Sequence, residues 1–287
     1  MNPQPIPALL PHGEGHQFVF YGDCCSGVPG KRNERNFAEI NATLRRMAPA
    51  PEFVVFLGDH IAGYESDPEA LRRQWTYWHD KEMCWLDTGR TPVYHVTSNH
   101  NTFDEKSERV WCDVFPNIPR NGPAGQEGLS YWVQRRDLLM VFVNTSFTGL
   151  DGYGHVECEW LEGVLAEHEH LRHKIVIGHH PVFPVNGYNE QPKWCVIGEE
   201  GERFWSVLVR RGVSAYLCSH IIAFDVQEHE GVVQVCSGGA GTNHGPGGFM
   251  GEGEYLHFVQ AALDTDALRL QTIDHHGRVR ERFIRTN

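Results

Sequence analysis

The stretch at residues 53–60, Phe-Val-Val-Phe-Leu-Gly-Asp-His, constrains the fold more than any other part of this sequence. A run of β-branched and aromatic residues that ends in Gly-Asp is typical of a fully buried strand that stops abruptly. Asp59 then lies at the carboxyl edge of the strand, where sites form in open α/β sheets, and Gly58 lets an ion approach closely. On this stretch alone, Asp59 is equally well explained as the cap of a following turn.

The pattern of a strand followed by a polar residue recurs along the chain. Further strands that precede such residues are predicted at 17–21, 91–97, 174–178 and 215–218. Helical spacing predicts helices at 34–47, 67–85, 104–114, 157–171 and 199–211. Hairpin-like strands are predicted at 129–135, 138–144, 223–228, 232–236, 255–264 and 267–274. Early βα units followed by later hairpins indicate two sheets flanked by helices.

Five of the predicted strand ends carry an oxygen or imidazole donor. These donors belong to Asp23, Asp59, Asn99, His179 and His220. Each of them alone fits a polar residue in a turn. Five such donors at one edge of a sheet system are suited to divalent ions of intermediate hardness. The sequence therefore predicts a metal centre.

The motifs that contain these donors follow one another in a characteristic order. They are Asp23-Cys24-Cys25, Gly58-Asp59, Ser98-Asn99-His100-Asn101, His179-His180-Pro181 and Ser219-His220-Ile221-Ile222. This order resembles the calcineurin-like metallophosphoesterase superfamily from about residue 18 to the region of residue 257. The resemblance implies a four-layer αββα sandwich of two mixed sheets, two metal ions bridged by Asp59, and hydrolysis of a phosphate ester by a metal-activated water. It also implies that His100 is the catalytic histidine that protonates the leaving group.

The chain departs from the family pattern at one of the two metal positions. Cys25 and Ile222 stand where the family has two histidine ligands of that first position. The other position keeps all of its expected ligands, namely Asp59, Asn99, His179 and His220. We therefore expect the first position to be altered or abandoned as a unit, with Asp23 and Cys25 as ligands suited to a softer metal. The expected cofactor is one or two ions of manganese, iron or zinc.

Residues next to these motifs are candidates for contact with a substrate. His60 directly follows Asp59, although strand alternation allows a sideways position equally well. Asn101 replaces the acidic residue that follows the histidine in the family, with Asp104 as a candidate substitute. His180 is expected to form the pocket wall beside a ligand. Loops that carry Tyr64, Tyr188 and His244 are expected to surround the metal edge, although each side chain is equally compatible with plain solvent exposure.

Composition limits the other possibilities. The 287 residues are 40% hydrophobic, which suits a single domain at residues 17–287 after a proline-rich, irregular arm at 1–16. A net charge of -12 argues against a nucleic-acid surface or an anionic membrane as partner, whereas bound divalent cations still permit an anionic substrate. The absence of an apolar run of about 18 residues and of a signal-peptide pattern predicts a cytoplasmic protein. The eight cysteines lack CxxC spacing, so most are expected to be reduced and buried.

The leading functional hypothesis is a metal-dependent hydrolase that acts on a small phosphomonoester or phosphodiester. A second hypothesis gives the altered centre different chemistry, with Cys25 as nucleophile or as ligand to a redox-active iron, and Cys24 as its disulfide partner. A third hypothesis is a noncatalytic metal-binding protein. The substrate, the metal and the oligomeric state do not follow from the sequence.

Overall fold

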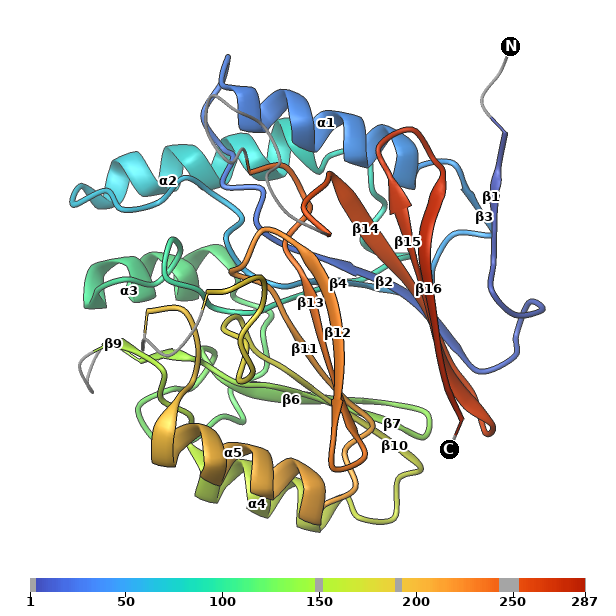
Figure 1. Cartoon of the computed structure of the whole chain (residues 1–287). Coiled ribbons are helices and arrows are strands. Elements are labelled where there is room, and N and C mark those ends of the chain that lie inside the picture. Colours follow the sequence, from blue (N-terminus) through green and yellow to red (C-terminus); the bar gives the residue numbers. More distant parts are fainter. Residues whose placement is uncertain (1–3, 148–151, 189–192, 243–252, 287) are drawn as a thin grey trace.

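The computed structural model describes residues 4–147, 152–188, 193–242 and 253–286. Two six-stranded mixed sheets pack face to face, and helices cover their outer sides (Figure 1). This arrangement confirms the expected αββα sandwich. Within the described ranges, no helix is long and apolar enough to cross a membrane.

The first sheet has the strand order β16-β15-β14-β2-β4-β5. Its strands are β2 (His16–Tyr21), β4 (Val54–Phe56), β5 (Val93–His95), β14 (His257–Leu263), β15 (Ala267–Asp274) and β16 (Val279–Thr286). Strands β2, β4 and β5 run parallel, because α1 (Arg32–Leu44) and α2 (Pro68–Tyr77) carry the chain back between them. The carboxyl ends of these three strands therefore lie at one edge of the sheet.

The second sheet has the strand order β12-β13-β11-β10-β7-β6. Its strands are β6 (Tyr131–Arg135), β7 (Leu138–Phe142), β10 (His173–Ile177), β11 (Ala215–Cys218), β12 (Phe224–His229) and β13 (Val232–Ser237). Strands β7, β10 and β11 run parallel, and α4 (Cys158–Glu167) and α5 (Gly198–Arg210) connect them. The carboxyl ends of β10 and β11 thus form a second edge that can contribute to a site.

Alternation along the strands divides the core into layers. In β7, Leu138, Met140 and Phe142 belong to the large core that includes the space between the sheets. Leu139 and Val141, which point the opposite way, pack in the core beneath α4 and α5. Both sets of side chains are fully buried, as a strand covered on both faces requires. The rigid sheets can therefore hold their carboxyl edges in fixed positions.

Two local features differ from the sequence-based predictions. The helix predicted at 67–85 ends at Tyr77 and continues as the π-helical turn η1 (Trp78–Glu82). This turn keeps Trp78 in the core while Glu82 accepts hydrogen bonds from Ser26 and from the backbone N–H of Gly27. The N-terminal arm was predicted to be irregular, but two of its residues form the short strand β1 (Ile6–Pro7), which pairs with β3 (Met47–Ala48).

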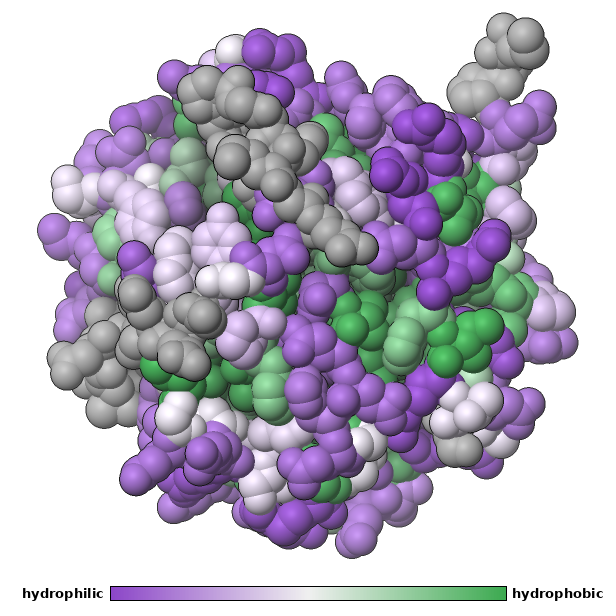
Figure 2. Space-filling view, viewed as in Figure 1, coloured by the Kyte–Doolittle hydropathy of each residue, from purple (hydrophilic) through white to green (hydrophobic). Residues whose placement is uncertain are grey.

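The remaining elements are short or lie at the surface. Helix α3 (Glu105–Val114) begins with a capping box between Asp104 and Ser107, and Asp104 is thereby committed to the helix rather than to His100. A small ladder joins β8 (Ser146–Phe147) to β9 (Gly152–Tyr153). Polar residues cover most of the face in Figure 2, with hydrophobic residues showing between them near its centre.

Candidate metal centre

The candidate site lies where the carboxyl edges of the two sheets meet. Asp23, Asp59 and Asn99 follow β2, β4 and β5 of the first sheet, and His179 and His220 follow β10 and β11 of the second sheet. The predicted group of donors at strand ends therefore comes from both sheets rather than from one. Parallel strands end abruptly here, which leaves short loops to aim the side chains.

Backbone strain is concentrated in these loops. Five residues of the site region adopt a positive φ although they are not glycines: Asp23, Cys25, Asp59, Tyr64 and His220. Each such residue costs about 1–3 kcal/mol, and clusters of them are a feature of functional sites. Gly58 also has a positive φ of 97°, and a Cβ atom there would lie 2.6 Å from Nδ1 of His179. The local backbone is thus arranged so that Asp59 and His179 come close together.

Four donor atoms form the first cluster. Oδ1 of Asn99 lies 2.9 Å from Nε2 of His179 and 3.1 Å from Nδ1 of His220. The two ring nitrogens lie 3.1 Å from each other. Oδ1 of Asp59 lies 3.5 Å from Nε2 of His179. These separations are close to the roughly 3 Å expected for neighbouring donors about 2.1 Å from a shared ion.

Hydrogen bonds on the far sides of the rings determine which nitrogens face inward as lone pairs. Nδ1 of His179 donates to the carbonyl oxygen of Leu57 at 2.8 Å, because a carbonyl can only accept. Nε2 of His220 donates to the carbonyl oxygen of Lys193 at 2.7 Å. In the neutral rings the inward nitrogens therefore carry no proton. Second partners of this kind are what orient metal-binding histidines.

Tyr64 orients the third donor. Nδ2 of Asn99 donates to the hydroxyl oxygen of Tyr64 at 2.6 Å, which turns Oδ1 of Asn99 toward the two histidines. Three acceptor atoms then face one another without a hydrogen between them. Acceptors at such distances repel unless a cation lies among them. The donor set of oxygen and imidazole nitrogen fits a divalent ion such as manganese, iron or zinc.

Electrostatics in the cluster favour a cation. Burial alone would raise the pKa of Asp59, but its three histidine neighbours, led by His100, lower it well below its usual range. Burial opposes the charged form of His179, yet the Asp59 carboxylate raises the pKa of that ring. Burial and the neighbouring His179 lower the pKa of His220 to about 3. A proton and a metal ion compete for the same negative potential here.

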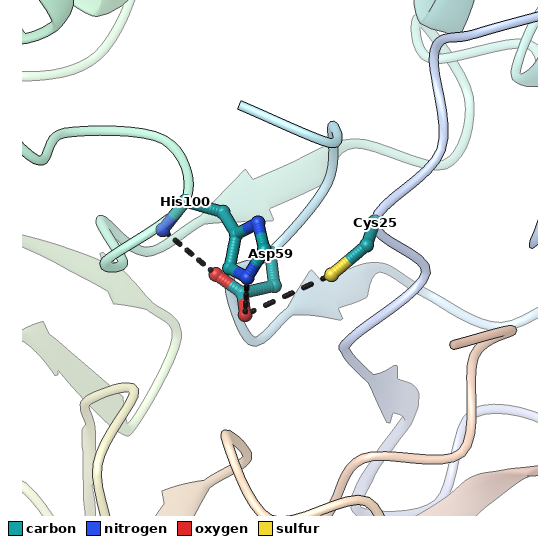
Figure 3. Close-up of side chains that lie close together, drawn as sticks. All are labelled: Cys25, Asp59 and His100. Atoms are coloured by element: carbon teal, nitrogen blue, oxygen red, sulfur yellow. Dashed lines mark hydrogen bonds and ion pairs between the residues drawn. The ribbon is translucent and has the colours of Figure 1, made fainter. Parts of the chain in front are cut away.

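A second cluster shares Asp59 with the first (Figure 3). Oδ2 of Asp59 lies 3.9 Å from Sγ of Cys25 and 3.8 Å from Nε2 of His100. The backbone N–H of His100 also donates to Oδ1 of Asp59 at 3.2 Å. Burial and the carboxylates of Asp59 and Asp23 raise the pKa of the Cys25 thiol well above its usual range. In the absence of a cation this sulfur is therefore a thiol.

Asp23 belongs to neither cluster among the described residues. Its Oδ2 accepts hydrogen bonds from the Ser219 hydroxyl and, at 2.8 Å, from the backbone N–H of His220. Burial and the nearby Asp59 carboxylate raise the pKa of Asp23 to about 7. The Asp23 carboxylate thus accepts a hydrogen bond from Ser219. In the motif of the family that the sequence resembles, a glycine stands at the position of Ser219. The role of Asp23 as a metal ligand remains a prediction.

Comparison with known structures shows which proteins have a similar fold. No protein-family model matches the chain, and no curated protein matches its sequence. Its structure is similar to that of a dimetal phosphatase from Danio rerio, with a TM-score of 0.68 and 16% identity over 95% of this chain and 99% of that chain. It is also similar to a purple acid phosphatase from yellow lupin (Lupinus luteus) seeds, with a TM-score of 0.66 and 14% identity. This chain has the metallophosphoesterase fold.

The extent of the two similarities differs. The match to the lupin enzyme covers 94% of this chain but 53% of that one, so the chain spans about half of the lupin enzyme's length. A third similar structure is the anchor in the inner membrane complex of Plasmodium, with a TM-score of 0.63 and 12% identity over 94% of this chain and 88% of that chain. The metallophosphoesterase fold therefore occurs in proteins whose described roles differ.

Two residues expected to contact substrate instead lie inside this metallophosphoesterase fold. His60 and Asn101 are fully buried, and Nδ1 of His60 accepts a hydrogen bond from Nδ2 of Asn101 at 2.7 Å. The His60 ring points into an aromatic core that includes Phe56 and Trp78, and its Nε2 lies 3.0 Å from Nδ1 of His95. The expected contact of these two residues with a substrate is not met, because both are buried. The side chain of His60 faces the aromatic core, on the side of the strand end away from the candidate site.

His180 supports the cluster from behind. It is fully buried, its ring lies 4.2 Å from the ring of His220, and its Nδ1 is hydrogen-bonded to the Thr145 hydroxyl at 2.8 Å. This position suits packing behind a ligand rather than substrate contact. Among the residues expected at the metal edge, Tyr64 contacts Asn99, and the Tyr188 ring lies 5.1 Å from that of Trp194. His244 lies outside the described residues.

The sequence-based prediction missed several supporting groups. The carbonyl oxygens of Leu57 and Lys193 and the hydroxyl groups of Thr145 and Ser219 set the orientation of the ligands, yet none of them belongs to a motif position taken as functional. The departure of Ser219 from the glycine of the family motif was the one available signal. Backbone carbonyls give no signal in a sequence, because every residue has one.

Proposed function

We propose that this protein is a metal-dependent hydrolase that acts on a small phosphomonoester or phosphodiester. The observation that carries this proposal is the set of inward-facing acceptors on Asn99, His179 and His220, whose own hydrogens are all directed outward. Asp59 supplies the negative charge beside them. These four residues would hold one divalent ion.

The metal supplies Lewis-acid chemistry: a bound divalent ion lowers the pKa of water toward neutrality and offsets charge on phosphoryl oxygens. The protein side chains do the remaining work. Asp59 and the histidines orient the centre, and their burial excludes bulk water from one side of it. His100 has a half-buried imidazole whose Nδ1 donates to the Ala62 carbonyl at 2.6 Å, so its Nε2 is the atom that would carry a proton to a leaving group.

Hydrolysis assays can test this proposal directly. An aryl phosphomonoester and an aryl phosphodiester would be offered to the protein loaded separately with manganese, iron, zinc or nickel. We expect turnover with at least one metal and a loss of more than about 100-fold in kcat/KM for Asn99→Ala or His220→Ala. His170→Ala, which removes an exposed histidine, is the matched control and should keep wild-type activity. Full activity in Asn99→Ala would contradict the proposed centre.

A noncatalytic metal-binding role is the second candidate. It is favoured by the incomplete first position, where Asp23 is bonded to Ser219 and Ile222 offers no donor atom. The anchor of the Plasmodium inner membrane complex shows a similar fold in an anchoring protein. Metal binding without hydrolysis of either ester under all four metals would favour this candidate over the hydrolase.

The third candidate, catalysis by a Cys25 nucleophile, has weaker support. Its thiol pKa is raised by burial beside two carboxylates, whereas a nucleophilic cysteine needs a lowered pKa. The disulfide with Cys24 is also absent, since all eight cysteines are free thiols. Cys25 is therefore better suited to a role in which a cation displaces its proton.

A further inference from the structure

The second cluster contains three different ligand types from three separate segments. Cys25 follows β2, Asp59 follows β4, and His100 follows β5. Sγ of Cys25, a carboxylate oxygen of Asp59 and a ring nitrogen of His100 lie within 4.8 Å of one another. We propose that these three residues form a second metal site, which contains a thiolate ligand and prefers zinc or another thiophilic divalent ion (Figure 3).

His100 is fixed with a lone pair toward this site. Its Nδ1 donates to the carbonyl oxygen of Ala62 at 2.6 Å, so in the neutral ring the lone pair is on Nε2, which lies 3.8 Å from Oδ2 of Asp59. The Tyr64 ring packs against the imidazole with its centroid at 4.4 Å. At Gly63, a Cβ atom would lie 1.7 Å from the carbonyl oxygen of His100, so the backbones here are in tight contact. The imidazole therefore needs little rearrangement to bind an ion.

Cys25 is held in place by its backbone. Its N–H donates to the carbonyl oxygen of Asp59 at 2.7 Å, and its carbonyl oxygen accepts from Nδ2 of Asn33 at 3.1 Å. The positive φ of 39° at Cys25 is the strained geometry that directs Sγ toward Asp59. Ligand atoms of a tetrahedral zinc site lie about 3.5 Å apart, so the 3.8 and 3.9 Å separations to Oδ2 need only a small contraction.

The neighbouring cysteine shows that this direction is specific. Sγ of Cys24 donates to the carbonyl oxygen of His60 at 2.8 Å, and the residue is fully buried in the core. Two adjacent thiols thus point to different places, one into the core and one toward Asp59. Cys24 is a matched control for every test of Cys25.

The proposed site differs from the family arrangement that the sequence resembles. Oδ2 of Asp23 accepts hydrogen bonds from Ser219 and His220, Asp23 is in neither described cluster, and the Ile222 side chain has no ligand atom. His100 takes their place beside Asp59. Thiolate, imidazole and carboxylate are all zinc ligands, three protein ligands are the number found in zinc sites that keep an open fourth position, and the thiolate favours soft over hard ions.

Cobalt substitution tests the site without any assay of turnover. Cobalt(II) bound by a thiolate gives an intense sulfur-to-metal charge-transfer band in the near ultraviolet, whereas nitrogen and oxygen ligands alone do not. We expect wild-type protein and Cys24→Ser to bind two cobalt ions per chain and to show this band. Cys25→Ser should bind one ion, lose the band and keep the visible bands of cobalt at the Asn99 cluster, which shows that the variant is folded. His100→Ala should weaken binding of the second ion at least about 10-fold.

Two results would overturn the proposal. One is saturation of the wild-type protein with cobalt without a charge-transfer band, and the other is a band that survives Cys25→Ser. The spectroscopic outcome is independent of the proposed hydrolase function, because a protein that hydrolyses no ester can still show the band. Conversely, if protein that binds one ion and shows no charge-transfer band hydrolyses an ester, the proposed hydrolase function stands and the proposal of a second metal site is rejected.

Discussion

Nε2 of His179 and Nδ1 of His220 lie 3.1 Å apart, and in the neutral rings neither atom carries a proton. The outward hydrogen bonds of both rings end on backbone carbonyls, which cannot donate. Oδ1 of Asn99 faces the same point. This arrangement of acceptors is the physical basis of the proposed metal centre, and it depends on groups that hydrogen-bond to the far side of each proposed ligand.

Tyr64→Phe should weaken metal binding at the Asn99 cluster. The change removes the hydroxyl acceptor for Nδ2 of Asn99, 2.6 Å away, and frees the amide to turn. We expect a loss of about 10-fold or more in manganese affinity, measured by calorimetry. Tyr188→Phe, in the aromatic pair with Trp194, is the control and should bind manganese like the wild-type protein. Unchanged affinity in Tyr64→Phe would show that the hydroxyl does not orient the ligand.

Gly58→Ala should destabilise the protein and impair metal binding together. The new Cβ would lie 2.6 Å from Nδ1 of His179 and 2.7 Å from Cβ of Ser98, at a φ of 97°. Strain and contact together should cost at least about 3 kcal/mol in the free energy of unfolding. Gly212→Ala, with a φ of 61° and no atom near the new Cβ, should cost only about 1–2 kcal/mol and leave metal binding intact. Equal effects of the two changes in urea unfolding would contradict the assigned role of Gly58.

Much of the fold was predictable because it depends on local patterns. The strands that carry the site, the hairpin of β6 and β7 and the start of α2 all follow from patterns within short stretches of sequence. Strand β16 was not predicted, because its eight residues are mostly exposed and rich in arginine. It is ordered by pairing with β15, which is a relation between strands that no local window contains.

The residues that meet at the candidate site were predictable, but the orientations of their side chains were not. Strand ends and motif order predicted that Asp59, Asn99, His179 and His220 belong to one site, and the structure places the four side chains close together. The hydrogen bond to Asp23 comes from Ser219, a residue 196 positions away in the sequence. The direction of the His60 side chain depends on which side of the strand end packs into the core. Such relations between distant residues are set by packing and were accessible only from the structure.

Stability should fall as pH falls below about 6.5, in part through His257. This residue is fully buried, its Nδ1 donates to the Tyr255 carbonyl, its Nε2 is bonded to the Ser237 hydroxyl, and burial lowers its pKa to about 4. The unfolded chain, with a pKa near 6.5, then binds the proton more readily. The contribution is fully present above pH 6.5, and about 3 kcal/mol is lost by pH 4.

His257→Gln is the variant that isolates this effect. Lacking the titrating ring, it should show a weaker dependence of unfolding free energy on pH between 4 and 6.5, measured by urea unfolding at several pH values. His170→Gln, at an exposed position, should keep the wild-type slope. A slope in His257→Gln as steep as that of the wild-type protein would remove His257 as a source of the pH dependence.

Zinc should activate and then inhibit hydrolysis. The proposed function gives Nε2 of His100 a proton to transfer, and the proposed second site uses the lone pair of the same atom. An ion at Cys25, Asp59 and His100 therefore displaces the proton donor. We expect the rate to rise to one zinc per chain and to fall toward two, whereas Cys25→Ser should lose the inhibitory phase. Inhibition that persists unchanged in Cys25→Ser would place the inhibitory ion elsewhere.

The central claim is tested most directly by metal content per chain, measured by inductively coupled plasma mass spectrometry on protein purified without chelator. We predict at least one equivalent of a transition metal, retained in His170→Ala and reduced by one equivalent in both Asn99→Ala and His220→Ala, while circular dichroism shows that these variants are folded. Wild-type protein that holds no metal after incubation with manganese, iron or zinc, or Asn99→Ala protein that holds as much as the wild type, would contradict the account.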